Sequence, residues 1–177
     1  MLSREEHVEH LRALAAGQRL AYTLVLSLIV AAAFVGSVGL AVAIAIVLFM
    51  LIGGSAPTAE DVVTLGVPII LAFLAAIGFT SNPRVHGETV RQAARRAARF
   101  GLVNGFVTGA IFGVVWSIIA GLTAVRFERW DLIFRQEVVL FGLALGIAVS
   151  PALAIYRAVT SVVEAVVLNV VSRSQAA

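Results

Sequence analysis

The feature that most constrains this chain is an uncharged apolar run from Leu20 to Ile52. A helix of that length would reach about 50 Å, whereas the hydrocarbon core of a bilayer is about 30 Å thick. The run therefore predicts either one helix that tilts or protrudes, or two crossings with a break near Gly36, Ser37 and Gly39. Two crossings would be too short, so we expect one long helix, retained as an anchor because it exceeds a signal-peptide apolar region.

The composition makes the whole chain an integral membrane protein. Its 177 residues are 60% apolar, and their mean hydropathy is +1.01, whereas soluble domains are about half apolar. The absence of cysteine excludes disulfides, thiolate metal sites and cysteine nucleophiles. All basic residues are arginines, and they lie beside the apolar runs, which is typical of membrane topology signals and predicts no nucleic-acid partner.

Three further apolar segments complete the predicted all-α fold, a polytopic membrane bundle of four transmembrane helices. The four spans are expected at about residues 20–52, 62–80, 100–125 and 138–156, within a transmembrane domain of residues 20–157. Residues 1–19 predict a cytoplasmic amphipathic helix. Residues 158–177 predict an amphipathic cytoplasmic extension or part of a fifth span, in which Arg157 and Glu164 would be costly charges in need of partners.

Small residues at every fourth position of the third span predict close helix packing, because they let backbones approach each other in lipid. They are Gly101, Gly105, Gly109, Gly113, Ser117 and Gly121, and the fourth span carries a matching set of Gly142, Gly146 and Ser150. Four residues advance a helix by about 400°, so such a ridge drifts by about 40° per step. No straight neighbour could follow all of it. We therefore expect one neighbour near Gly101 to Gly109 and another near Gly113 to Gly121.

A stripe of arginines precedes the third span on the side opposite the ridge. Arg91, Arg95 and Arg99 lie about 200° around the helix from Ala93 and Ala97. They predict a cytoplasmic topology determinant near lipid headgroups, or a binding surface for an anionic headgroup or an acidic partner. With four spans and an inner N-terminus, ten of the 13 arginines face the cytoplasm, so both termini of this multi-pass cell-membrane protein are expected inside.

The spans carry no residue pattern that identifies a reaction. None of their interiors contains an ionisable group, which pumps and membrane enzymes usually place there. Asn104 and Thr108 could line a polar path, although a hydrogen bond between helices is the better interpretation of Asn104. His7 and His10 have the spacing of a metal pair but lack a third ligand, so we expect no metal or cofactor.

These observations favour a non-enzymatic membrane subunit that assembles with itself or with other membrane proteins through small-residue helix interfaces. Its partners would be membrane lipids, including anionic ones, and the other members of a homo-oligomer or membrane complex. The alternative is a small channel or transporter with a path between helices kinked at Pro68 and Pro151. A membrane enzyme with interfacial groups such as His86 and Glu88 is the third hypothesis.

Overall fold

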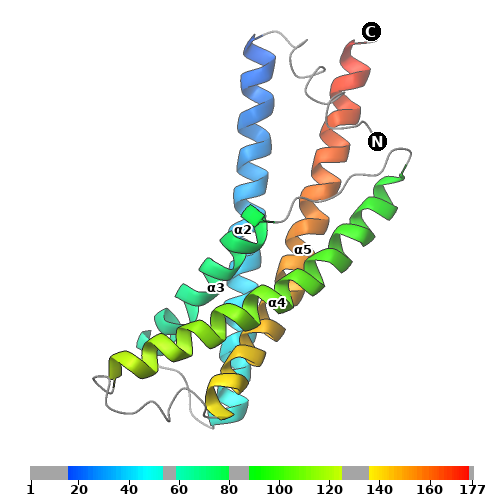
Figure 1. Cartoon of the computed structure of the whole chain (residues 1–177). Helices are drawn as coiled ribbons and strands as arrows, with labels where there is room; N and C mark the ends of the chain where they lie inside the picture. The colour runs from blue at the N-terminus through cyan, green and yellow to red at the C-terminus, as the bar shows by residue number, and fades with distance from the viewer. Residues whose placement is uncertain (1–15, 54–58, 80–87, 125–135, 176–177) are drawn as a thin grey trace.

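The computed structural model describes residues 16–53, 59–79, 88–124 and 136–175, and this part of the chain is all-helical (Figure 1). Its four helices are α2 (Ala16–Gly53), α3 (Ala59–Phe79), α4 (Val90–Ala124) and α5 (Gln136–Gln175). The predicted all-α fold is therefore confirmed. The predicted N-terminal helix of residues 1–19 lies outside the described residues, apart from Ala16 to Arg19, which begin α2.

The long apolar run forms one unbroken helix, as expected, because α2 contains no proline and no charge after Arg19. The glycines near its middle do not interrupt it. Its inner face is a small-residue row in which Ser37, Ala41 and Ala45 are buried, so neighbouring backbones can come close.

Three of the described helices, and not four, are long and apolar enough to cross a membrane. The candidate spans are Gly17–Leu48, Val90–Ile119 and Val139–Val166. The expected second span is a helix, but the described apolar part of α3 is only Leu65–Gly78.

A separate fifth span does not form, because α5 continues without a break from the predicted fourth span to Gln175. An unbroken helix cannot cross the bilayer and return. At about 60 Å it extends well beyond one hydrocarbon thickness. The basic segment before the third span is likewise continuous with it, since α4 begins at Val90.

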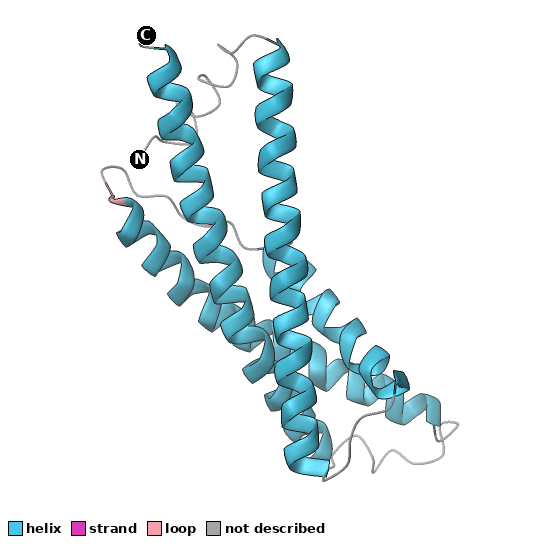
Figure 2. Cartoon of the chain, turned by 180° about the vertical axis from the view of Figure 1, so that it is seen from behind, coloured by secondary structure: helices cyan, strands magenta, loops and turns pink. Residues whose placement is uncertain are grey.

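The helices alternate in direction, and the start of α2 lies at the same end of the molecule as the end of α5 (Figures 1 and 2). Helix α4 runs obliquely across α5 in both views. The core lies where α2, α3 and α5 meet, and its largest fully buried side chains include Ile69, Phe73, Leu145 and Leu153. The N-terminal part of α2 and the C-terminal part of α5 extend beyond this core (Figure 1).

Candidate functional site

The small-residue ridges of α4 and α5 pack against each other within one chain. Opposite residues form a regular antiparallel register: Gly101 with Ala154, Gly105 with Ser150, Gly109 with Gly146, and Gly113 with Gly142. A Cβ atom added to Gly101 would lie 2.7 Å from the Cα of Ala154, and one added to Gly113 would lie 2.7 Å from the Cα of Gly142. Both distances are shorter than real Cβ contacts, so the spacing requires glycine.

The expectation of two neighbours for this ridge is wrong for Gly113, which contacts the same helix as Gly101. Rows of residues four apart run at about 26° to a helix axis, so two such rows lie along each other when their helices cross at about 50°. Helix α4 crosses α5 obliquely, which compensates for the drift that a straight neighbour could not follow (Figure 2). Ser117 is half-buried, and Gly121 lies beyond the residues whose packing the structure describes.

One polar bond joins the two ridges. The Ser150 hydroxyl on α5 donates to the carbonyl oxygen of Leu102 on α4, at 2.8 Å. Close backbones make this bond possible, because a serine side chain is short. Of the two residues expected to line a polar path, Thr108 donates to the carbonyl oxygen of Asn104 within its own helix, at 2.6 Å. The Nδ2 atom of Asn104 is buried and has no hydrogen-bond partner among the described residues.

A junction of all four helices surrounds Arg157, which is only 6% exposed. An aromatic cluster of Phe34, Phe73 and Tyr156 joins α2, α3 and α5 there, with ring centroids 6.0 to 6.5 Å apart in edge-to-face geometry. The guanidinium carbon of Arg157 lies 5.4 Å from the centroid of the Phe100 ring on α4. Such edge-to-face and cation–π contacts each stabilise a fold modestly beyond the area they bury.

Arg157 also satisfies the end of α3. Its Nη2 atom donates to the carbonyl oxygen of Ala76, at 2.7 Å. This carbonyl lies in the last turn of α3, which ends at Phe79. The negative end of the helix dipole favours a cation at this position. The burial of Arg157 was not predicted from the sequence. The available signal was a single charge directly after an apolar span and beside Tyr156.

The arginine stripe of α4 lies on its exposed side. Arg91, Arg95 and Arg99 are all exposed, whereas Ala93 and Ala97 on the opposite face are buried at 3% and 1% exposure. The packing of the alanines fixes the rotation of the helix, so the three guanidinium groups point away from the bundle.

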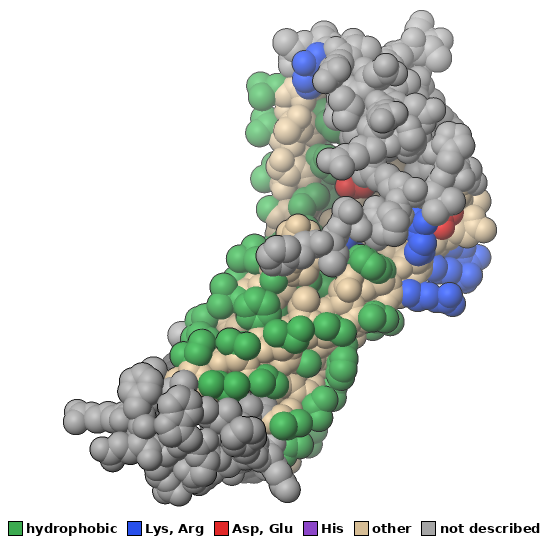
Figure 3. All heavy atoms as spheres, viewed as in Figure 1, with side chains coloured by type: hydrophobic (Ala, Val, Ile, Leu, Met, Phe, Trp, Pro, Cys, Tyr) green, Lys and Arg blue, Asp and Glu red, His purple; other side chains and the backbone are tan. Residues whose placement is uncertain are grey.

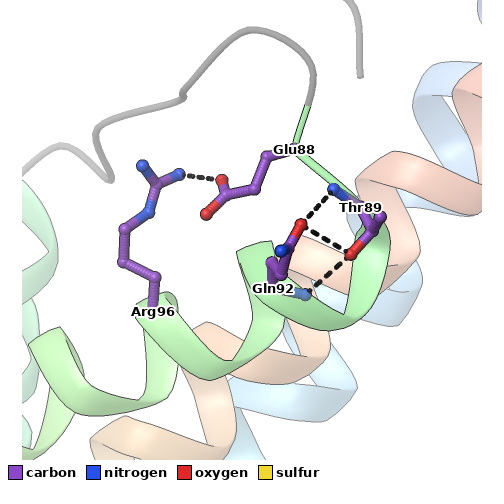
Figure 4. Close-up of polar contacts among 4 residues, drawn as sticks. All are labelled: Glu88, Thr89, Gln92 and Arg96. Carbon is purple, nitrogen blue, oxygen red and sulfur yellow. Dashed lines mark hydrogen bonds and ion pairs between the residues drawn. The ribbon is translucent and has the colours of Figure 1, made fainter.

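The start of α4 is held by polar contacts that were not predicted from the sequence (Figure 4). Thr89 and Gln92 form a reciprocal capping box: the Gln92 Oε1 atom accepts from the Thr89 amide at 3.0 Å, and the Gln92 amide donates to the Thr89 hydroxyl at 3.3 Å. Beside it, Arg96 and Glu88 form an ion pair with a 2.6 Å contact between Nη2 and Oε2. The Thr-x-x-Gln pattern was the signal for this cap.

The remaining candidate residues are not brought together into a site by the described structure. His7, His10 and His86 lie outside the described residues, so the structure does not test a role for them. Among the residues that are described, no group of three or more His, Cys, Asp or Glu side chains could hold a metal ion. No family model, curated protein or solved structure matches this chain.

Proposed function

We propose that this protein is a non-enzymatic membrane subunit that assembles with a second copy or with another helical membrane protein through the N-terminal half of α2. The observation that supports this is an apolar half-helix extending beyond the packed core. Every side chain described from Gly17 to Ala32 is exposed or half-buried. Leu20 and Leu28 are 64% and 69% exposed, respectively.

The junction around Arg157 serves as the reference depth for describing how far α2 extends beyond the core. Arg157 contacts Ala76 and Phe100, and its neighbour Tyr156 contacts Phe34, so these residues of four helices lie at similar depth. From Phe34, the rest of α2 reaches about 30 Å, which is one hydrocarbon thickness. We infer that the membrane boundary on the arginine side lies near this level.

The N-terminal half of α2 would then project about 25 Å beyond that boundary. Its exposed leucines and valines would cost free energy in water, roughly 1.5 to 3 kcal/mol for each large side chain left unburied. The C-terminal part of α5 also has exposed valines, namely Val159, Val162 and Val166. An apolar surface of this kind outside the bilayer is typical of an interaction site between proteins.

This proposal shifts the assembly surface away from the ridges of α4 and α5. Their glycines are already covered within the chain, whereas Gly17, at the start of α2, has no atom within 4 Å of an added Cβ. Small residues that remain open are the ones that can receive another helix.

Cysteine cross-linking in native membranes tests the assembly directly, since the chain has no cysteine of its own. We expect Leu28→Cys to give an oxidised product, at twice the chain mass for self-assembly or at another mass for a different protein with a cysteine at the interface. Leu74→Cys, 54% exposed on α3 within the proposed membrane level, is the matched control and should stay monomeric. A purely monomeric Leu28→Cys band, together with a single-chain mass by light scattering and no co-purifying protein, would contradict the proposal.

A second candidate function, passage of a small solute, is supported by Asn104 alone. Its buried Nδ2 atom has no hydrogen-bond partner among the described residues, and such a group inside a membrane span often contacts a transported molecule or water. Solute flux into liposomes that falls with Asn104→Leu would support this candidate, and the absence of flux under any gradient would remove it.

A further inference from the structure

The arginine face of α4, which we define as Arg91, Arg95 and Arg99, is rigid and oriented. The three residues lie on one helix that continues into a candidate membrane span, Val90–Ile119. The capping box at Thr89 anchors its first turn, and the buried alanines behind the face fix its rotation. Each step from one arginine to the next rises about 6 Å along the helix.

The charge of this face is not neutralised by acidic side chains of the described residues. The acid at the start of α4, Glu88, pairs with Arg96. Within the described ranges, no ion pair involves Arg91, Arg95 or Arg99. Three like charges on successive turns repel one another, so an external anion would relieve that repulsion.

The three arginines do not stabilise α4 through its dipole either. The N-terminal end of a helix carries the positive end of its dipole, and it favours acidic rather than basic side chains. The first turn of α4 has no acidic residue, and Arg91 is its second residue. Arg157, in contrast, contacts the C-terminal end of α3, where a cation is stabilising.

The exposed face of α4 changes from charged to apolar directly below the arginines. Leu102, Val103 and Phe106 are 43%, 65% and 39% exposed, and Val103 follows Arg99 by four residues on the same side. Figure 3 shows arginines gathered near the start of α4, with hydrophobic side chains along the helix beyond them. This junction between charge and apolar surface lies near Phe100, at the level of the Arg157 contacts.

We propose that the arginine face and the apolar stripe below it bind an anionic phospholipid. The guanidinium groups pair with the headgroup phosphate, which the planar fork of arginine can contact through two hydrogen bonds. An acyl chain lies along Leu102, Val103 and Phe106. Only a ligand with an anionic head and a long apolar tail complements both parts, and this favours a phospholipid over an acidic protein segment.

The test uses the purified full-length chain in neutral detergent, with phosphatidylglycerol or phosphatidylcholine added at equal low concentration and the retained lipid counted by native mass spectrometry. We expect retention of phosphatidylglycerol in preference to phosphatidylcholine, and a weaker preference in 1 M salt. Changing all three arginines to Gln should abolish it, with about five-fold lost per arginine for roughly 1 kcal/mol each. The control is Arg19→Gln, which removes an exposed arginine near the start of α2 and should retain the preference.

Two further arms separate the lipid from other anions. Val103→Ser should weaken retention of phosphatidylglycerol while leaving the arginines in place. Glycerol 3-phosphate and an acidic peptide, each offered as a competitor at the same concentration, should not displace the lipid. The proposal is overturned if the triple Gln variant, with an unchanged circular dichroism spectrum, retains the lipid like the wild type. It is also overturned if the acidic peptide or glycerol 3-phosphate binds as tightly as phosphatidylglycerol.

Discussion

At the scale of single residues, the α4–α5 contact is a contact between backbones. Opposite Gly109, the nearest atoms are the carbonyl oxygen of Leu145 and the Cα of Gly146, at 2.8 and 3.0 Å from an added Cβ. Neither atom can move without moving its helix. The glycine at this position lets the two backbones touch, where a larger residue would keep them apart.

Gly109→Ala is therefore expected to destabilise the fold, by about 1 to 3 kcal/mol as in other overpacked cores. The change in thermal unfolding midpoint in detergent measures it. Gly36→Ala is the matched control, because an added Cβ there meets nothing within 4 Å and alanine favours a helix over glycine. Equal midpoints for Gly109→Ala and the wild type would show that the helices can separate at no cost.

Arg157→Met is expected to lower the free energy of unfolding by about 1 to 3 kcal/mol, because the buried hydrogen bond to the Ala76 carbonyl and the contact with the Phe100 ring are lost. Arg157→Lys should recover part of this loss, since an ammonium group can still donate. Arg95→Met, which removes an exposed arginine, should leave the unfolding midpoint unchanged. If Arg157→Met were as stable as Arg95→Met, the hydrogen bond would contribute nothing net.

At the scale of helices, the pairing of α4 with α5 is unequal on its two sides. An added Cβ on Gly142 meets the Cγ2 atom of Val114 at 2.6 Å, which is a side-chain atom that can be removed. An added Cβ on Gly113 meets the Cα of Gly142, where nothing remains to be trimmed. An added Cβ should therefore be tolerated better at Gly142 than at Gly113, once Val114 is shortened.

This difference predicts a selective rescue. Val114→Ala should restore part of the stability lost in Gly142→Ala, and a double-mutant cycle of unfolding free energies measures the coupling. The carbonyl oxygen of Ala110, at 3.0 Å, should keep the rescue incomplete. The same Val114→Ala change should not help Gly113→Ala. Rescue of both variants to the same extent would mean that the helices shift as rigid bodies.

At the scale of the whole molecule, the junction around Arg157 separates a packed body from two extended helix ends. The body contains the second half of α2, α3, most of α4 and the first half of α5, and the ends belong to α2 and α5 (Figure 1). The exposed arginines of α4 lie on the side of the junction where these ends extend.

The position of the boundary can be tested with single cysteines and a membrane-impermeant maleimide. We expect Gln92→Cys, exposed in the first turn of α4, to react, and Ile111→Cys, 55% exposed on the same helix, to stay unlabelled because lipid surrounds it. Comparing right-side-out with inverted vesicles gives the side of the membrane. Labelling of both positions would place the boundary elsewhere.

Apolar length and small-residue spacing predicted the helices and their close packing well, because both depend on local sequence. The buried position of Arg157 could not be predicted in the same way, because its partner Ala76 is 81 residues away in the sequence. The partner of the glycine ridge was also missed, since a crossing angle is a property of two helices.

The length of α2 has a consequence for the lipid around the molecule. Helix α3 reaches about 32 Å, close to one hydrocarbon thickness, whereas α2 reaches about 57 Å. Lipid beside α3 can match the helix without deformation, whereas α2 has to tilt or protrude, so the bilayer is perturbed on one flank of the protein. Two molecules that meet along this flank deform less lipid together than apart, which gives a weak attraction that depends on membrane thickness.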